Sequence, residues 1–164
     1  MLGSTKQSKF KQEQILNCRR IFTDSMKIMM ETADIDTFFS RYDVAAEAIN
    51  EAGRVAGENT PCLNGITPKE ALHTLRNDLP SILTPCIDRY MDKQTIRICN
   101  LVRGRVSKAQ ALEVIAENYE DRVPPECMEH WKWRIGKLVS KLKKLDEIEK
   151  DGNPSKNQKK LTAH

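Results

Sequence analysis

The chain has 164 residues, a length typical of one folded domain, and its 39% hydrophobic and 30% charged residues are ordinary for a globular protein. Its 27 basic and 23 acidic residues give a formal net charge of +4, which is mild for a dedicated nucleic-acid-binding domain. No apolar run approaches the roughly 20 residues that cross a bilayer, and the N-terminus lacks the apolar segment of a secretory signal. We therefore expect no membrane association and no export.

The cysteines indicate a reducing environment. They are odd in number, lie far apart, and several fall in helical patterns where cysteine behaves as a small hydrophobic residue. This arrangement does not suggest a disulfide framework, so we expect a cytoplasmic protein. The positions are Cys18, Cys62, Cys86, Cys99 and Cys127.

The N-terminal third of the chain predicts two helices. From about Lys9 to Thr32, with residues 1–8 before it as a flexible N-terminus, apolar residues recur every three or four positions. Asp34 and Asp36 can then accept hydrogen bonds from the free amides of a new first turn. The second helix keeps the same period until Gly57, since glycine is the usual residue just past a helix C-terminus.

The third helix has the clearest start signal. Thr67 can cap the amide of Glu70, the Glu70 side chain can reach back to the Thr67 amide, and Pro68 occupies the first helical position. The helix is predicted to be short because Leu79 precedes Pro80, which disfavours helical angles at Leu79.

Two alternatives remain for the fourth helix. In the first, Thr84 caps a new helix with Pro85 at its first position, and this helix runs to about Arg103. In the second, a single kinked helix continues across Pro80 or Pro85.

The C-terminal part predicts two more helices and a tail. Ser107 caps a fifth helix that reaches about Tyr119, and the prolines at 124 and 125 separate it from a last helix over about 125–150. Residues 151–164 contain almost no apolar side chain and are predicted to be a disordered basic tail. The last helix carries a coiled-coil-like apolar ladder made of Met128, Trp131, Ile135, Leu138, Leu142 and Leu145.

No segment shows the sustained alternation of a strand. The sequence therefore predicts an all-α protein, a bundle of five to six helices with a long C-terminal amphipathic helix, forming a single helical domain over residues 9–150.

No catalytic or metal site emerges from the motifs. Cys127 and His130 have the spacing of half a zinc site, but a second close pair is missing. Cys62 lacks the sequence context of a nucleophile, whether or not it meets His73 in space. Phosphate-binding loops and metalloprotease motifs are absent as well. We expect no cofactor and no metal, and an enzyme is the least favoured class.

Basic clusters are the one feature that points to a charged partner. Such residues can bind phosphates, or they can simply keep a helix surface solvated and complement the helix dipole. Trp133 lies off the apolar ladder, where an indole can stack on a base, anchor a protein interface or pack against the fifth helix. The clusters comprise Arg103, Arg105 and Lys108 near Gly104, and Lys137, Lys141 and Lys144 on the last helix.

Two strings carry a resemblance to a known family. Residues 36–43 read DTFFSRYD, and residues 86–90 read CIDRY. They resemble the TFFSRYD and F-I-x-R-Y motifs of a family of bacterial and phage-borne helical proteins without a known activity, some of which are joined to small zinc-ribbon modules. The resemblance extends to about Tyr119 and implies an all-helical architecture. The chain differs from the family in lacking a zinc ribbon and in reading LVRGR at 101–105, where a more lysine-rich element is usual.

Each of these strings holds an Arg-Tyr pair. Arg41 and Arg89 can form a polar clasp between helices, with carboxylates such as Asp43 or Asp88 as partners, or they can form an anion site together.

Two hypotheses on function follow. The first is a non-catalytic protein-interaction or scaffold module, or a homo-oligomer, whose interface is the apolar ladder together with Trp133. The alternative is a nucleic-acid-associated accessory protein of a phage or mobile element, which binds phosphates through the basic clusters.

Overall fold

The computed structural model describes residues 2–101 and 106–151, and this part of the chain is built from six α-helices. Within these ranges no strand occurs, and none of the helices is both long and apolar enough to span a membrane. The predicted all-α fold with five to six helices and a long C-terminal helix is thus confirmed. The helices are α1 (Leu2–Glu31), α2 (Ile35–Ala56), α3 (Pro68–Asn77), α4 (Leu79–Leu101), α5 (Lys108–Glu120) and α6 (Pro125–Asp151).

The chain divides into two compact units between Arg89 and Tyr90. The division falls inside α4, so one continuous helix contributes its first half to the N-terminal unit and its second half to the C-terminal unit. Joint unfolding of the two units, as the predicted single domain over 9–150 requires, stays a prediction.

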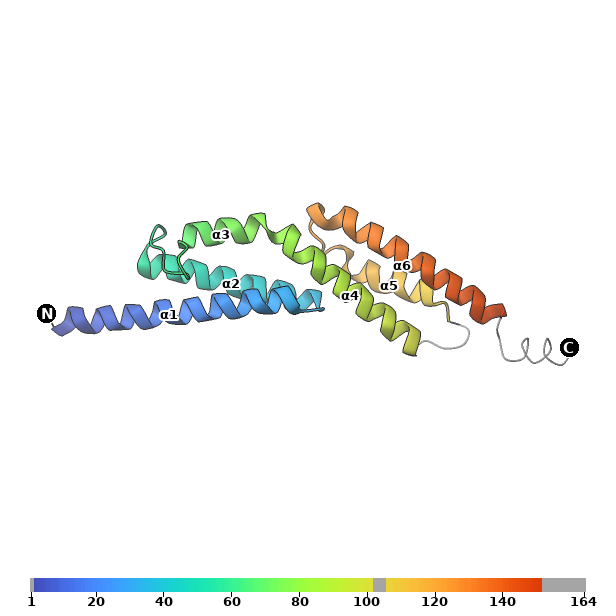
Figure 1. Ribbon diagram of the computed structural model, residues 1–164, viewed down its shortest axis with the longest axis horizontal. Coiled ribbons are helices and arrows are strands. Elements are labelled where there is room, and N and C mark those ends of the chain that lie inside the picture. Colours follow the sequence, from blue (N-terminus) through green and yellow to red (C-terminus); the bar gives the residue numbers. More distant parts are fainter. Residues whose placement is uncertain (1, 102–105, 152–164) are drawn as a thin grey trace, which may run out of the picture. The chain divides into compact units, whose positions relative to one another are not determined.

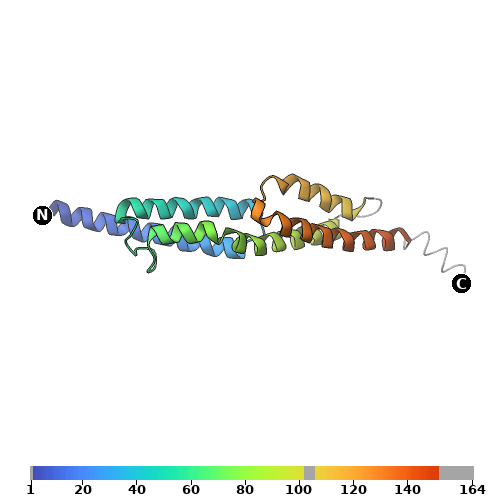
Figure 2. The same cartoon turned by 90° about the horizontal axis from the view of Figure 1, so that it is seen from above.

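In the N-terminal unit, α1 and α2 run antiparallel and α3 packs on α2 (Figures 1 and 2). The core contains fully buried side chains from each of these helices, among them Met29, Phe38, Ile49 and Leu75. Helix α1 begins at Leu2, ahead of the predicted start at Lys9, so residues 2–8 are helical. Its first turns extend past the end of α2 (Figure 1).

The capping predictions for this unit hold in part. The Thr67 hydroxyl accepts the backbone amide of Glu70 at 3.1 Å, with Pro68 at the first helical position, as predicted. Gly57 ends α2 with φ of +97°, a conformation that L side chains rarely adopt. Asp34 occupies the N-cap of α2, but its carboxylate accepts the hydroxyl of Thr37 at 2.6 Å instead of a backbone amide.

The predicted new helix at Thr84 is wrong, and the alternative of one helix across the prolines is correct. Helix α3 ends at Asn77, before Pro80 as expected. Leu79, which was expected to avoid helical angles, is instead the first residue of α4, and Pro85 lies in the interior of that helix. An internal proline removes one backbone hydrogen bond and costs about 3 kcal/mol. Leu83 and Ile87 flank it and are fully buried, so the packing of this helix face offsets that cost.

The C-terminal unit consists of the second half of α4 with α5 and α6, the last two running antiparallel (Figure 1). Its core centres on aromatic rings. Tyr90 of α4 lies with its ring centroid 5.1 Å from that of Tyr119 and 6.5 Å from that of Trp131, nearly parallel to the indole. Trp131 is 1% exposed, and Leu112 and Leu142 are buried beside it.

Helix α5 is capped twice. As predicted, the Ser107 hydroxyl accepts the backbone amide of Gln110 at 3.2 Å. In addition, the Asp146 carboxylate of α6 accepts the amides of Lys108 at 2.9 Å and Ala109 at 3.2 Å, and the hydroxyl of Ser107 at 2.9 Å. A carboxylate at a helix N-terminus also complements the helix dipole, so Asp146 ties α6 to the start of α5.

We expect Asp146→Ala to lower the free energy of unfolding by about 1–2 kcal/mol at neutral pH, because buried amides of α5 lose their acceptor. Burial acts to raise the pKa of Asp146, but the two amides, the Ser107 hydroxyl and the Lys108 ammonium together hold that pKa below its ordinary value. A lowered pKa contributes stability above the unfolded value of about 3.9, which is lost as the pH falls through the folded value.

Urea denaturation at pH 7 and at pH 3 measures this effect. The gap between wild type and Asp146→Ala should be full at pH 7 and smaller at pH 3. The neighbouring exposed Glu147→Ala is the control, and an equal loss in both variants would contradict the capping role.

Candidate functional site

Of the two motif arginines, Arg89 makes defined hydrogen bonds. Arg89 of α4 donates from Nε to the Thr32 carbonyl at 2.8 Å and from Nη2 to the Met29 carbonyl at 3.4 Å. Met29 lies in the last turn of α1 and Thr32 directly follows the helix, and carbonyls at a helix C-terminus lack an amide partner within the helix. Arg89 is therefore an interhelical clasp, but its partners are backbone carbonyls and not the predicted carboxylates.

The two motifs flank the turn between α1 and α2. The string at 36–43 starts directly after this turn, and the string at 86–90 reaches it from α4 through Arg89 and through the Cys86 thiol, 3.9 Å from the Asp34 carbonyl. Arg41 is half-buried in the second turn of α2. With the Arg89 guanidinium directed at the end of α1, the geometry supports a structural role for Arg89.

We expect Arg89→Ala to lower the free energy of unfolding by about 1–3 kcal/mol, because it leaves two partly buried carbonyls without a donor at the negative end of α1. Arg97→Ala on the exposed face of the same helix is the control and should lie within about 0.5 kcal/mol of wild type. Chemical denaturation followed by circular dichroism measures both. Similar losses in the two variants would rule out the clasp.

The predicted basic cluster near Gly104 does not form a described surface. Arg103 and Arg105 lie outside the described residues. Lys108 is only 3% exposed, and its ammonium is paired with the Glu149 carboxylate. A buried ammonium requires such a partner. Lys108 is therefore unavailable to an external phosphate, and its place in the predicted anion-binding set is corrected.

The apolar ladder of α6 is divided between core and surface. Its central residues close the core of the C-terminal unit: Trp131 is 1%, Leu138 5% and Leu142 1% exposed. Met128 and Ile135 are half-buried. Leu145 is 40% exposed. The ladder is thus mainly an internal packing surface of the C-terminal unit.

The remaining predicted residues of α6 share one face. Trp133, Lys137, Lys141 and Lys144 follow one another at steps of four and three along the helix, and all are exposed. The Lys137 ammonium lies 4.3 Å from the centroid of the Trp133 ring, a cation–π contact, and the indole is still 52% exposed. We call these four residues the basic face of α6.

Trp133 and the lysines came from different predicted sets, and the structure brings them together. The indole was assigned to a protein interface and the lysines to a phosphate site, whereas the basic face combines them. On the opposite side of the same helix, Trp131 and Leu138 are buried in the core. The basic face therefore points to solvent. Among the described residues, no ion pair involves Lys137, Lys141 or Lys144.

The thiols of Cys18 and Cys86 are buried and are not activated for nucleophilic catalysis. Burial raises the pKa of Cys86 to about 11, although the Arg89 charge acts in the opposite direction. The pKa of Cys18 is also raised, chiefly by burial and next by the charge of Glu51. Both thiols are therefore protonated at neutral pH, while a nucleophilic cysteine needs its thiolate.

Among the described residues, no hydrogen bond joins Cys62 to His73. Cys62 is buried and its carbonyl accepts Arg19 Nε at 3.0 Å, while His73 Nε2 lies 2.7 Å from the Asn77 amide nitrogen. Within 2–101 and 106–151, no three His, Cys, Asp or Glu side chains are grouped to hold a metal ion. In this part of the chain, no further side chains therefore complete a metal site with Cys127 and His130.

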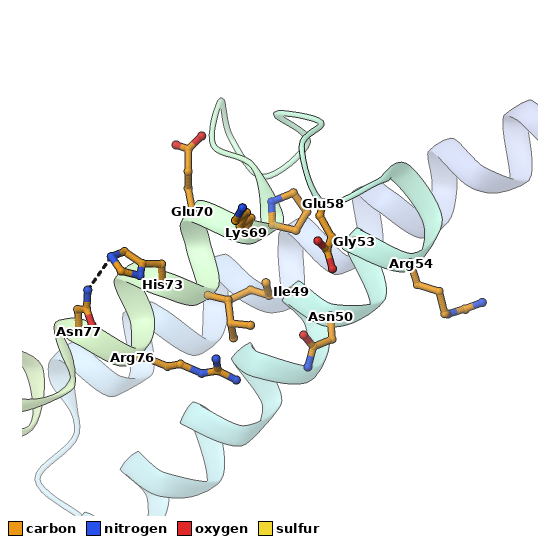
Figure 3. A pocket seen from close by; sticks show the side chains of 12 residues that line it. Ile49, Asn50, Gly53, Arg54, Glu58, Lys69, Glu70, His73, Arg76 and Asn77 are labelled. Atoms are coloured by element: carbon orange, nitrogen blue, oxygen red, sulfur yellow. Dashed lines mark hydrogen bonds between the residues drawn. The ribbon is translucent and has the colours of Figure 1, made fainter.

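A pocket of about 690 Å³ lies between α2 and α3 (Figure 3). Its floor is formed by Ile49 and Gly53 of α2 and by Pro68 and Leu72 of α3. Polar and charged side chains surround this floor, and most of them are exposed. The sequence analysis missed this pocket, because it depends on how α3 folds back onto α2. We call it the α2–α3 groove.

Comparison with protein-family models, with curated proteins and with solved structures finds no match to this chain. Any statement on function therefore depends on the surfaces of the molecule itself, of which the basic face of α6 and the α2–α3 groove are the best defined.

Proposed function

We propose that the protein is a non-catalytic nucleic-acid-associated protein that contacts phosphates through the basic face of α6. The supporting observation is the row of Lys137, Lys141 and Lys144, exposed and without ion pairs in the described part of the chain, beside an exposed Trp133. An accessory role in a phage or mobile element is the biological setting we propose.

The composition of this face favours phosphates over a protein partner. Lysine is depleted in protein–protein interfaces, while phosphate oxygens take most protein–DNA hydrogen bonds, many of them from lysine and arginine. The scaffold hypothesis rested on the apolar ladder, and three of its side chains, Trp131, Leu138 and Leu142, are used in the protein's own core. A partner binding through these residues would have to open the C-terminal unit.

The dimensions fit a short stretch of backbone. From Trp133 to Lys144 the helix rises about 16 Å, at roughly 1.5 Å per residue. Three lysines can neutralise about three phosphates, which gives a binding constant that falls with salt at a slope of about −2 on single strands or about −3 on duplex. The indole adds a flat apolar surface on which an unpaired base can stack.

The test is a salt titration of binding to a fluorescently labelled 20-nucleotide single strand and to the matching duplex. The variant Lys137→Gln/Lys141→Gln/Lys144→Gln should flatten the slope by about two to three units. Lys9→Gln/Lys27→Gln/Lys93→Gln changes the net charge equally at exposed positions outside α6 and is the matched control. Equal slopes for the two triple variants, or no binding by wild type at low salt, would refute the proposal.

Trp133→Ala separates stacking from charge. If a base stacks on the indole, single-strand affinity should fall at least about fivefold, the lower end of measured base–aromatic stacking, while duplex affinity changes little. An equal change on both nucleic acids would assign Trp133 to the support of Lys137 alone.

A further inference from the structure

The α2–α3 groove belongs to the N-terminal unit and is independent of the proposed function, which concerns α6. Gly53 forms part of the floor and has no side chain. A Cβ added there would lie 3.4 Å from the Cβ of Pro68 on the facing helix. Helices α2 and α3 therefore approach each other closely at this point. The floor residues Ile49 and Gly53 on one helix, and Pro68 and Leu72 on the other, are each spaced by four, so each pair lies on one face of its helix.

The α3 edge of the groove is basic. Lys69, His73 and Arg76 follow at steps of four and three and line the groove together. In Figure 3 the Arg76 side chain extends from α3 toward α2, whereas Arg54 extends away from α3. Arg54 is paired with Glu51, but neither Lys69 nor Arg76 has an ion pair among the described residues.

Acidic residues also line the groove, and they lie at its Lys69 end, where the Glu58 carbonyl accepts the Lys69 amide at 3.1 Å and Glu70 follows Lys69 in α3. Glu70 points away from the floor in Figure 3, and Glu58 lies beside Gly53, at the end of the groove remote from Arg76. The surface near Arg76 therefore presents a guanidinium without a carboxylate partner, next to the imidazole of His73 and the amide of Asn77. A guanidinium in such a position binds carboxylates well because of its paired donors.

The exposure of the rim favours a macromolecular occupant over a small molecule. Sites for small ligands bury 70–90% or more of the ligand in the usual case, while most side chains around this floor face solvent. Helix α3 spans about 15 Å from Pro68 to Asn77, which is close to three turns of a docked helix. An amphipathic helix places apolar and charged residues at the same steps of three and four as this groove.

We propose that the α2–α3 groove binds an amphipathic helix of a partner protein, with apolar side chains on the floor and acidic side chains facing Lys69 and Arg76. Charge complementarity to these two cations sets the acidic character of the partner. The pattern expected of the partner is an apolar pair spaced by four, flanked by Asp or Glu at steps of three and four.

The probe is a fluorescently labelled synthetic helical peptide with leucines on one face and glutamates beside them at steps of four and three. It is titrated against the full chain carrying Lys137→Gln/Lys141→Gln/Lys144→Gln, so that the basic face of α6 does not capture it. Lys69→Glu/Arg76→Glu should weaken binding about tenfold or more, because like charges then meet across the groove. Lys93→Glu/Arg97→Glu, at exposed positions of α4, is the matched control and should bind as the parent.

Two further peptides complete the test. A peptide with lysines in place of the glutamates should prefer the charge-reversed variant, and a peptide with serines in place of the leucines should lose binding to every variant. Circular dichroism confirms that each variant folds. The proposal is overturned by equal binding to both double variants, by the absence of saturable binding at about 1 mM peptide, or by anionic lipid vesicles that bind through Lys69 and Arg76 while the peptide does not.

Discussion

Trp131→Ala is expected to remove about 3–5 kcal/mol from the free energy of unfolding. The indole is 1% exposed, and its ring packs almost parallel to Tyr90 of α4, with ring centroids 6.5 Å apart. Its deletion leaves a cavity between α4 and α6 that rigid helices fill only in part. Since small domains have total stabilities of about 5–15 kcal/mol, the loss should shift the urea midpoint strongly.

Trp133→Ala is the matched control, because it removes the same side chain two residues away on the same helix. Trp133 is 52% exposed, and its contact with Lys137 is worth about 1 kcal/mol or less. Circular dichroism in urea measures both variants without depending on tryptophan fluorescence. Comparable losses would mean that the core of the C-terminal unit is not where the structure places it.

The parts of the fold that could be predicted from the sequence depend on local interactions. The caps at Thr67 and Ser107 bond amides only three residues away, so the sequence alone contains both partners. The apolar face of α6 was predicted for the same reason, as its period is local, but whether it faces the core or a partner was not. The prediction that a helix starts at Pro85 was wrong, because burial of the residues around it, a tertiary effect, outweighs the local preference of proline for the first position of a helix.

The surfaces were harder to predict, because they depend on which helices meet. From the sequence, Lys108 was expected to be available to a phosphate. In the structure, Glu149 and Asp146 of α6, more than 35 residues away in sequence, lie beside Lys108 at the start of α5. The clasp made by Arg89 required the end of α1 as its partner, 57 residues away. Lys69, His73 and Arg76 showed a helical step in the sequence, but only the docking of α3 on α2 turns that row into the edge of a groove.

Phe38→Ala should cost the N-terminal unit about 3–5 kcal/mol, since this ring is fully buried and meets Phe39 edge to face at 5.6 Å. Phe10→Ala, at a side chain 61% exposed, is the control and should stay within about 0.5 kcal/mol of wild type.

The Phe38→Ala variant also tests the predicted single domain over 9–150. Both tryptophans, Trp131 and Trp133, lie in the C-terminal unit, so their fluorescence reports that unit alone. Helix α4 runs through the boundary at Arg89, and its buried residues serve both cores, Leu83 and Ile87 on one side and Met91 on the other. Because helix formation is cooperative along the chain, loss of one core should weaken the other. We therefore expect Phe38→Ala to lower the midpoints of the fluorescence and circular dichroism transitions together. An unmoved fluorescence midpoint would show that the two units unfold independently.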